Sequence, residues 1–223
     1  MTILRKPIAA CVLACLAFGS AGCALLTKSD PIAPRYYNPE RLNAPDPEPT
    51  SRNKPDSNPA HKLRLRAVRA SEHLKERIVF RDSPTELGFY DGRRWTELPE
   101  HYLRRQLSAA LFESQRVQQV IAGPAATLEV EMSAFEEVRE PRRVGRVQIM
   151  FLLHDGNLVR FRETVTIERP IAGEGTPSAE ATVSALGEAL AAAVQRIVDR
   201  TLRELDFVTP TRPSPVPEPP PLP

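Results

Sequence analysis

The chain has 223 residues, of which 41% are hydrophobic and 26% are charged, a composition typical of one globular domain with flanking segments. Its formal net charge of +2 falls to zero if Arg5 and Lys6 leave with an amino-terminal leader, because 28 basic and 28 acidic residues then remain. This balance argues against a nucleic acid as partner, since binding to phosphates draws on a basic surface. The cysteines are Cys11, Cys15 and Cys23, so the sequence after residue 23 can form neither a disulfide nor a thiolate metal site.

The amino terminus has the three parts of a signal peptide. Residues 1–6 carry two positive charges, residues 8–18 form an apolar run, and residues 19–22 are small. The apolar run is too short to span a bilayer as a helix in the mature protein. We therefore predict a leader at residues 1–22 that is cleaved off.

The residues around the cleavage point predict a lipid anchor. Ser20-Ala21-Gly22-Cys23 resembles the lipobox of bacterial lipoproteins, with cleavage between Gly22 and Cys23 and acylation, palmitate included, on Cys23. Two or more acyl chains hold a protein stably on a membrane. Ala24 follows in place of an aspartate, which by resemblance to Gram-negative lipoproteins favours the outer membrane and a domain facing the periplasm. The alternative is ordinary secretion, with Cys23 left as a free thiol.

Proline-rich stretches flank the domain. Residues 31–59 are rich in Pro, Asn, Asp and Arg and show almost no apolar periodicity, so we predict a disordered, lipid-anchored tether at residues 23–60. The domain itself is predicted at residues 61–207, and a disordered tail at residues 208–223. The PxxP spacing in the tail leaves a second interpretation open, a ligand for a groove that recognises proline-rich peptides.

Between these ends the hydrophobic pattern changes period in a regular order. Two-residue alternation predicts strands, and three- to four-residue spacing predicts helices. The predicted elements, in chain order, are strands at residues 62–67, 77–81 and 86–90, a helix at 99–111, strands at 127–138, 146–154 and 158–168, and a long helix opened by Thr176-Pro177. Asp155-Gly156-Asn157 predicts a hairpin between the last two strands. The order strands, helix, strands, helix predicts an α+β domain with an antiparallel sheet and both helices on one face.

Residues that could carry chemistry do not form a recognisable set. The four histidines are not paired at metal-ligand spacing, and the sequence has no glycine-rich phosphate loop. Glu129 and Glu131 share one face of an alternating strand that ends at Glu136-Glu137, so acid–base chemistry by paired carboxylates stays open. We predict no enzyme, no metal and no cofactor. An envelope hydrolase whose site is assembled from distant residues is the alternative.

One block of the domain resembles a known family. The sequences RIVFRDSP at residues 77–84, ELGFY at 86–90, RW at 94–95 and LP at 98–99 are similar to the ABC-type transport auxiliary lipoproteins, the PqiC-like family. The same family typically has a tyrosine pair in a proline-rich stretch after the anchoring cysteine, a central strand like LEVEM, and an alanine-rich last helix. The resemblance thus covers most of the chain from Cys23 to Leu205.

The resemblance implies a non-enzymatic outer-membrane lipoprotein of a Gram-negative lipid-transport system. The implied partners are an MCE (mammalian cell entry) domain protein and inner-membrane ABC transporter components, with a homo-oligomer as a further option. The rival class is an interaction lipoprotein of another envelope machine, either a peptidoglycan-synthase activator or an assembly partner of an outer-membrane barrel.

The family motif also selects four residues that could contact a partner, Arg81, Tyr90, Arg94 and Trp95. For Trp95 we favour a place in the core, and we expect docking on an exposed strand edge or loop of the same sheet. For Arg81 we favour a surface charge at a strand end over one half of a fixed ion pair.

Overall fold

The computed structural model describes residues 33–40, 61–113, 117–173 and 177–208, and a compact unit begins at Pro34. The predicted leader, the lipobox with Gly22 and Cys23, and the tail from residue 209 lie outside the described residues. Their roles remain predictions.

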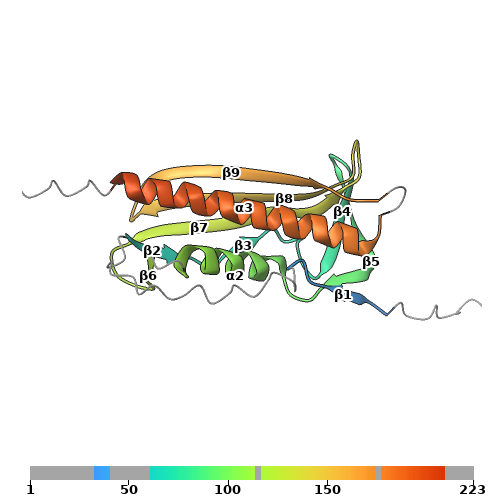
Figure 1. The fold of residues 1–223 in the computed structure, drawn as a ribbon, viewed down its shortest axis with the longest axis horizontal. Coiled ribbons are helices and arrows are strands. Elements are labelled where there is room, and N and C mark those ends of the chain that lie inside the picture. The colour runs from blue at the N-terminus through green and yellow to red at the C-terminus, as the bar shows by residue number, and fades with distance from the viewer. Residues whose placement is uncertain (1–32, 41–60, 114–116, 174–176, 209–223) are drawn as a thin grey trace, which may run out of the picture. The chain divides into compact units, whose positions relative to one another are not determined.

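Nine strands and two helices make up the described part of this unit (Figure 1). The helices are α2 (Pro99–Phe112) and α3 (Ala179–Val208). The strands are β1 (Arg35–Tyr37), β2 (His61–Leu65), β3 (Arg69–Ala70), β4 (Arg77–Ser83), β5 (Glu86–Trp95), β6 (Val117–Gln119), β7 (Ala126–Val138), β8 (Val144–Asp155) and β9 (Leu158–Pro170).

Strand β7 organises the sheet because it is paired along both of its edges. One edge pairs antiparallel with β8, which in turn pairs antiparallel with β9. The other edge pairs in parallel with β2 at residues 126–128, with β3 at 131–132 and with β4 at 136–138. Residues 61–83 therefore run beside β7 in the same direction, as one long strand with interruptions.

The sheet is mixed, which corrects the predicted antiparallel sheet in part. The prediction is right for the pairs β4–β5, β7–β8 and β8–β9, and wrong for the parallel pairs that β7 makes with β2, β3 and β4 and for β1–β5 and β2–β6. Helix α2 lies between β5 and β6 in the chain, and a long crossover of this kind is what brings a later strand back parallel to an earlier one. Alternation shows which face of a strand is buried, but not the direction of its neighbour.

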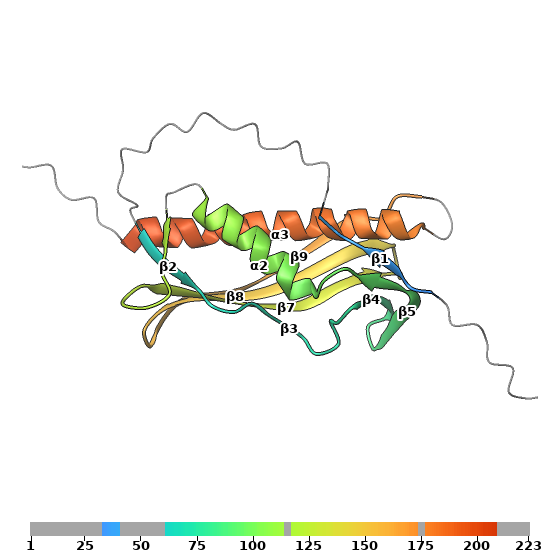
Figure 2. The same cartoon turned by 90° about the horizontal axis from the view of Figure 1, so that it is seen from below.

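Both helices cover the same face of the sheet, as predicted (Figure 2). The stripe of α3 that includes Leu186, Leu190 and Ile197 is fully buried against the sheet. At Gly145 of β8 an added Cβ would lie 3.0 Å from the backbone nitrogen of Leu186, so this glycine lets the helix approach closely. By length and hydropathy α3 could cross a membrane, but 61% of its most apolar window is buried, as in the core helix of a domain.

The amino-terminal segment corrects the predicted tether boundary. Residues 35–37 form β1, which pairs in parallel with β5, although the prediction placed them in a disordered tether at residues 23–60. Pro39 is buried, and its carbonyl oxygen lies 2.1 Å from where a Cβ at Gly187 of α3 would be. Glu40 forms an ion pair with Arg105 of α2 at 2.8 Å. The composition of this segment predicts that it cannot order by itself. In the structure, the domain supplies a strand edge and a helix surface against which residues 35–40 pack.

Two local predictions depend on short-range geometry. The hairpin is confirmed, since β8 ends at Asp155, β9 begins at Leu158, and Gly156 has a positive φ of 53°. Helix α3 begins at Ala179, and the Ser178 hydroxyl caps it by accepting the backbone N–H of Ala181 at 3.1 Å. Thr176, which was predicted to open this helix, lies outside the described residues.

Candidate functional site

Trp95 is a core residue. Its side chain is 1% exposed, and its ring lies 4.9 Å from the ring of Phe135 and 6.4 Å from that of Tyr102. Trp95 closes β5 and Tyr102 lies in α2, so the tryptophan joins the sheet to the first helix. The interpretation of Trp95 as core, favoured from sequence, agrees with this position, and a partner has no access to the ring in the folded domain.

Arg94 stabilises its own strand. One of its guanidinium nitrogens donates hydrogen bonds to the backbone carbonyls of Tyr90 and Arg93, both at 3.0 Å. These acceptors lie on β5, where the pairing with β4 shifts register between Arg77 and Val79. The arginine therefore satisfies carbonyl groups at an irregular part of the sheet.

Arg81 forms the ion pair that was the less favoured interpretation from sequence. Its Nε and Nη2 donate to the two carboxylate oxygens of Glu136 at 2.9 and 3.2 Å, and the Glu136 side chain is 0% exposed. Arg146 of β8 donates to the same carboxylate through Nε at 3.1 Å and through Nη2. Glu136 is thus a buried charge held between two arginines, and the interpretation of Arg81 as a surface charge is wrong.

The next residue of β7, Glu137, is also 0% exposed but has different partners. The Tyr90 hydroxyl donates to it at 2.5 Å and the Thr182 hydroxyl of α3 at 3.5 Å, so Glu137 lies on the helix-covered face. Arg143 and Arg139 approach its Oε1 at 3.5 and 3.8 Å. Burial, and then the hydrogen bond to Glu137, raise the pKa of the Tyr90 hydroxyl above its ordinary value of 10.0.

We call these groups the arginine–carboxylate cluster, made up of Arg81, Asp82, Tyr90, Glu136, Glu137, Arg139, Arg143 and Arg146. Consecutive residues of a strand point to opposite faces, so Glu136 and Glu137 cannot act on one substrate atom. Each carboxylate is also occupied by charged or hydroxyl donors. The acid–base pair left open by the sequence is therefore not formed at these two residues, and the cluster is suited to fixing β4, β5, β7 and β8 to one another.

Sequence reasoning missed Arg139, which links Asp82 of β4 to Glu137 of β7. Its guanidinium carbon lies 3.5 Å from the ring centre of Phe80, and Nη1 donates to Asp82 at 2.9 Å. The Phe80 ring in turn covers Gly88, where an added Cβ would lie 2.2 Å from the ring. The available signal was composition, since four arginines at residues 139–146 follow the two glutamates directly.

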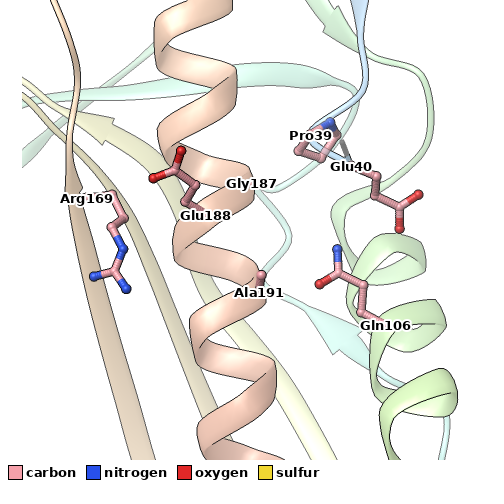
Figure 3. Close-up of a pocket in the computed structure, with 7 residues that line it drawn as sticks. All are labelled: Pro39, Glu40, Gln106, Arg169, Gly187, Glu188 and Ala191. Atoms are coloured by element: carbon pink, nitrogen blue, oxygen red, sulfur yellow. The ribbon is translucent and has the colours of Figure 1, made fainter. Parts of the chain in front are cut away.

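The described part of the chain lines a groove and a smaller pocket of a size that could hold a small molecule. A groove of about 650 Å³ crosses α3 and is lined by Pro39, Glu40, Gln106, Arg169, Gly187, Glu188 and Ala191 (Figure 3). Arg169 and Glu188 lie on one side of the helix, and Pro39, Glu40 and Gln106 lie on the other, so the polar groups do not converge on one point. A smaller pocket of about 360 Å³ lies beside Arg81 and Arg146 of the cluster. Among the described residues that line these two pockets, no nucleophile is hydrogen-bonded to a base.

Among the described residues, no group of three or more His, Asp or Glu side chains is arranged to hold a metal ion. His61 contacts Asp206 at 2.9 Å and His154 contacts Glu129 at 3.4 Å, in two separate pairs.

The fold is similar to that of solved structures. A crystal structure of a protein from Xanthomonas campestris superposes with a TM-score of 0.60 at 20% identity, covering 66% of this chain and 86% of that one. A crystal structure of an uncharacterized protein has a TM-score of 0.57 at 14% identity, covering 76% of this chain and 99% of that one. No curated protein shows significant sequence similarity to the chain.

The family follows from the sequence match over the domain. The profile of the ABC-type transport auxiliary lipoprotein components matches residues 41–198. The chain belongs to this family, which confirms the resemblance seen in the motif of β4 and β5. It is therefore an auxiliary lipoprotein of the bacterial envelope.

Proposed function

We propose that the protein is a non-enzymatic outer-membrane lipoprotein of an ABC/MCE-type intermembrane lipid-transport system. The observation that carries the proposal is the family match over residues 41–198, together with the lipobox that ends at Cys23. In such a system an inner-membrane ABC transporter and an MCE-domain protein form the conduit. The lipoprotein is the component that acylated Cys23 holds at the outer membrane.

The geometry of the domain supports a docking role over a catalytic one. The best candidates for chemistry, Glu136 and Glu137, are used to join four strands. The larger groove is open and its polar residues diverge. A domain whose two buried carboxylates are each held by arginines or hydroxyl groups is suited to hold a surface in place for a partner.

Acylation is tested with Cys23→Ala, using Cys15→Ala as the matched control because Cys15 lies inside the apolar run of the leader. We expect palmitate labelling and membrane fractionation to be lost in Cys23→Ala and retained in Cys15→Ala. Ala24→Asp should move the protein toward the inner membrane. Palmitate label that persists in Cys23→Ala would contradict the anchor.

The transport role is tested by co-purification of the full-length lipoprotein from its native membrane. We expect an MCE-domain protein to be recovered, and we expect genes for a permease, an ATPase and an MCE protein beside this one. Recovery of a penicillin-binding protein or a barrel-assembly protein instead would favour the other class of envelope lipoprotein. Hydrolysis of an envelope substrate by the purified protein, without MCE binding, would overturn the proposal.

A further inference from the structure

Four large apolar side chains project into solvent from three separate parts of the chain. Ile121 is 92% exposed in the loop between β6 and β7, Leu158 and Val159 are 71% and 52% exposed at the start of β9, and Phe207 is 88% exposed at the end of α3. We call these four residues the distal tips. Single exposed apolar residues are ordinary, but several that gather at one place indicate a contact surface.

The distal tips lie at one end of the domain. Both views place the β8–β9 turn, the β6–β7 loop and the carboxyl end of α3 at the same end (Figures 1 and 2). His61 at the start of β2 contacts Asp206, next to Phe207, and pairs with Val117 at the start of β6. Thr127, at the start of β7, pairs with His154, which is also paired with Val159.

The amino-terminal segment joins the domain at the opposite end. Arg35 of β1 pairs with Arg93 of β5, and both views show β1 near the amino-terminal end of α3 (Figures 1 and 2). Helix α3 has 30 residues, so its two ends are separated by about 45 Å. The distal tips are at its carboxyl end, and β1 is at its amino end.

The distance between the distal tips and β1 favours a protein partner over the anchoring membrane. Cys23 precedes Pro34 by 11 residues, and even a fully extended chain of that length spans only about 40 Å. If Cys23 is acylated, the link ties the β1 end of the domain to the bilayer, and the tips reach the bilayer only when the domain lies along it. A protein partner in the periplasm meets the tips in every other orientation.

We propose that the distal tips are the apolar anchors by which the domain docks on the conduit protein of the transport system. This inference rests on the proposed function and names its surface. It agrees with the expectation that docking uses an exposed strand edge or loop of the same sheet. Neither of the two pockets includes these residues, so the partner must supply the recesses that receive the four side chains. A stable interface buries more than about 1,000 Å², so the tips would form its centre and flanking residues its rim.

The test uses the full-length lipoprotein in its native membrane. A photo-crosslinking amino acid is placed at Ile121, at Leu158 and, as the control, at Tyr36, which is 64% exposed at the opposite end. We expect crosslinks to the MCE protein from the first two positions and none from the third. The double variant Ile121→Glu/Leu158→Glu should reduce MCE co-purification at least tenfold, whereas Tyr36→Glu should leave it unchanged.

Several outcomes would overturn the inference. They are full co-purification by the double variant, crosslinks to the MCE protein from position 36 alone, or crosslinks from the tips to the chain's own tail or to a second copy. A membrane contact is examined with the mature Cys23→Ser chain and vesicles of phosphatidylethanolamine and phosphatidylglycerol. Vesicle binding that depends on Ile121 and Leu158 would make the surface a bilayer contact instead. If wild-type protein recovers no MCE protein, the proposed function itself fails.

Discussion

The two ends of the domain use apolar and charged residues in opposite ways. At the end formed by β4 and β5, two carboxylates are fully buried and arginines and a tyrosine surround them. At the other end, four large apolar side chains are exposed, while the charged residues Asp206 and Asp155 contact His61 and Arg160. The first arrangement fixes several strands relative to one another. The second contributes little to folding, so a contact with another molecule can explain it.

The largest effect is expected at Trp95. Trp95→Ala should lower the free energy of unfolding by about 3–5 kcal/mol, because it removes a fully buried indole between the sheet and α2. Chemical denaturation with fluorescence of the tyrosines or circular dichroism measures this change. Tyr36→Ala is the control and should cost far less. A folded Trp95→Ala variant of unchanged stability that has lost its partner would reverse the assignment to the core.

A smaller but still large effect is expected at the buried ion pair. Arg81→Met should destabilise the domain by about 2–3 kcal/mol, because Glu136 loses two charged hydrogen bonds while Arg146 remains. Arg142→Met is the matched control, because Arg142 is exposed in the loop between β7 and β8. This substitution should change stability by less than about 0.5 kcal/mol. Equal effects of the two substitutions in urea unfolding would show that the cluster does not stabilise this end.

At Tyr90 we expect an intermediate effect that depends on pH. Tyr90→Phe removes the hydroxyl that donates to Glu137 and should cost about 1–2 kcal/mol near neutral pH. Burial, and then this hydrogen bond, raise the pKa of Tyr90, so its contribution is fully present below pH 10 and is lost as the pH rises through the raised value. Melting temperatures between pH 8 and 11 should therefore converge for wild type and Tyr90→Phe at the alkaline end. A difference that stays constant over this range would exclude the hydroxyl as its cause.

The smallest effect on stability is expected at the distal tips. Leu158→Ser should change the free energy of unfolding by less than about 0.5 kcal/mol, because the side chain is 71% exposed. Leu153→Ser, in the core of the same hairpin, is the matched contrast, since Leu153 is fully buried. Thermal unfolding of both variants compares an exposed leucine with a buried leucine of the same hairpin. A large loss in Leu158→Ser would mean that the tips stabilise the fold.

Much of the local structure could be predicted from the sequence. Pro99 marks the first turn of α2, Gly156 supplies the positive φ of the β8–β9 turn, and alternation gives the buried faces of β7 and β8. The motif of β4 and β5 was enough to indicate the family. Each of these signals depends on residues close together in the chain.

The candidate site and the strand directions needed the tertiary structure. Glu136 pairs with Arg81, which is 55 positions away in the sequence. Strand β1 pairs with the edge of β5, although its sequence predicts a tether. The exposed residues Ile121 and Phe207 are far apart in the sequence. Their segments lie at the same end of the domain because β2 pairs with β6 and contacts the end of α3. The physical reason is that periodicity reports which side of an element avoids water. Which element covers that side, and which charge meets which, is decided when the whole chain packs.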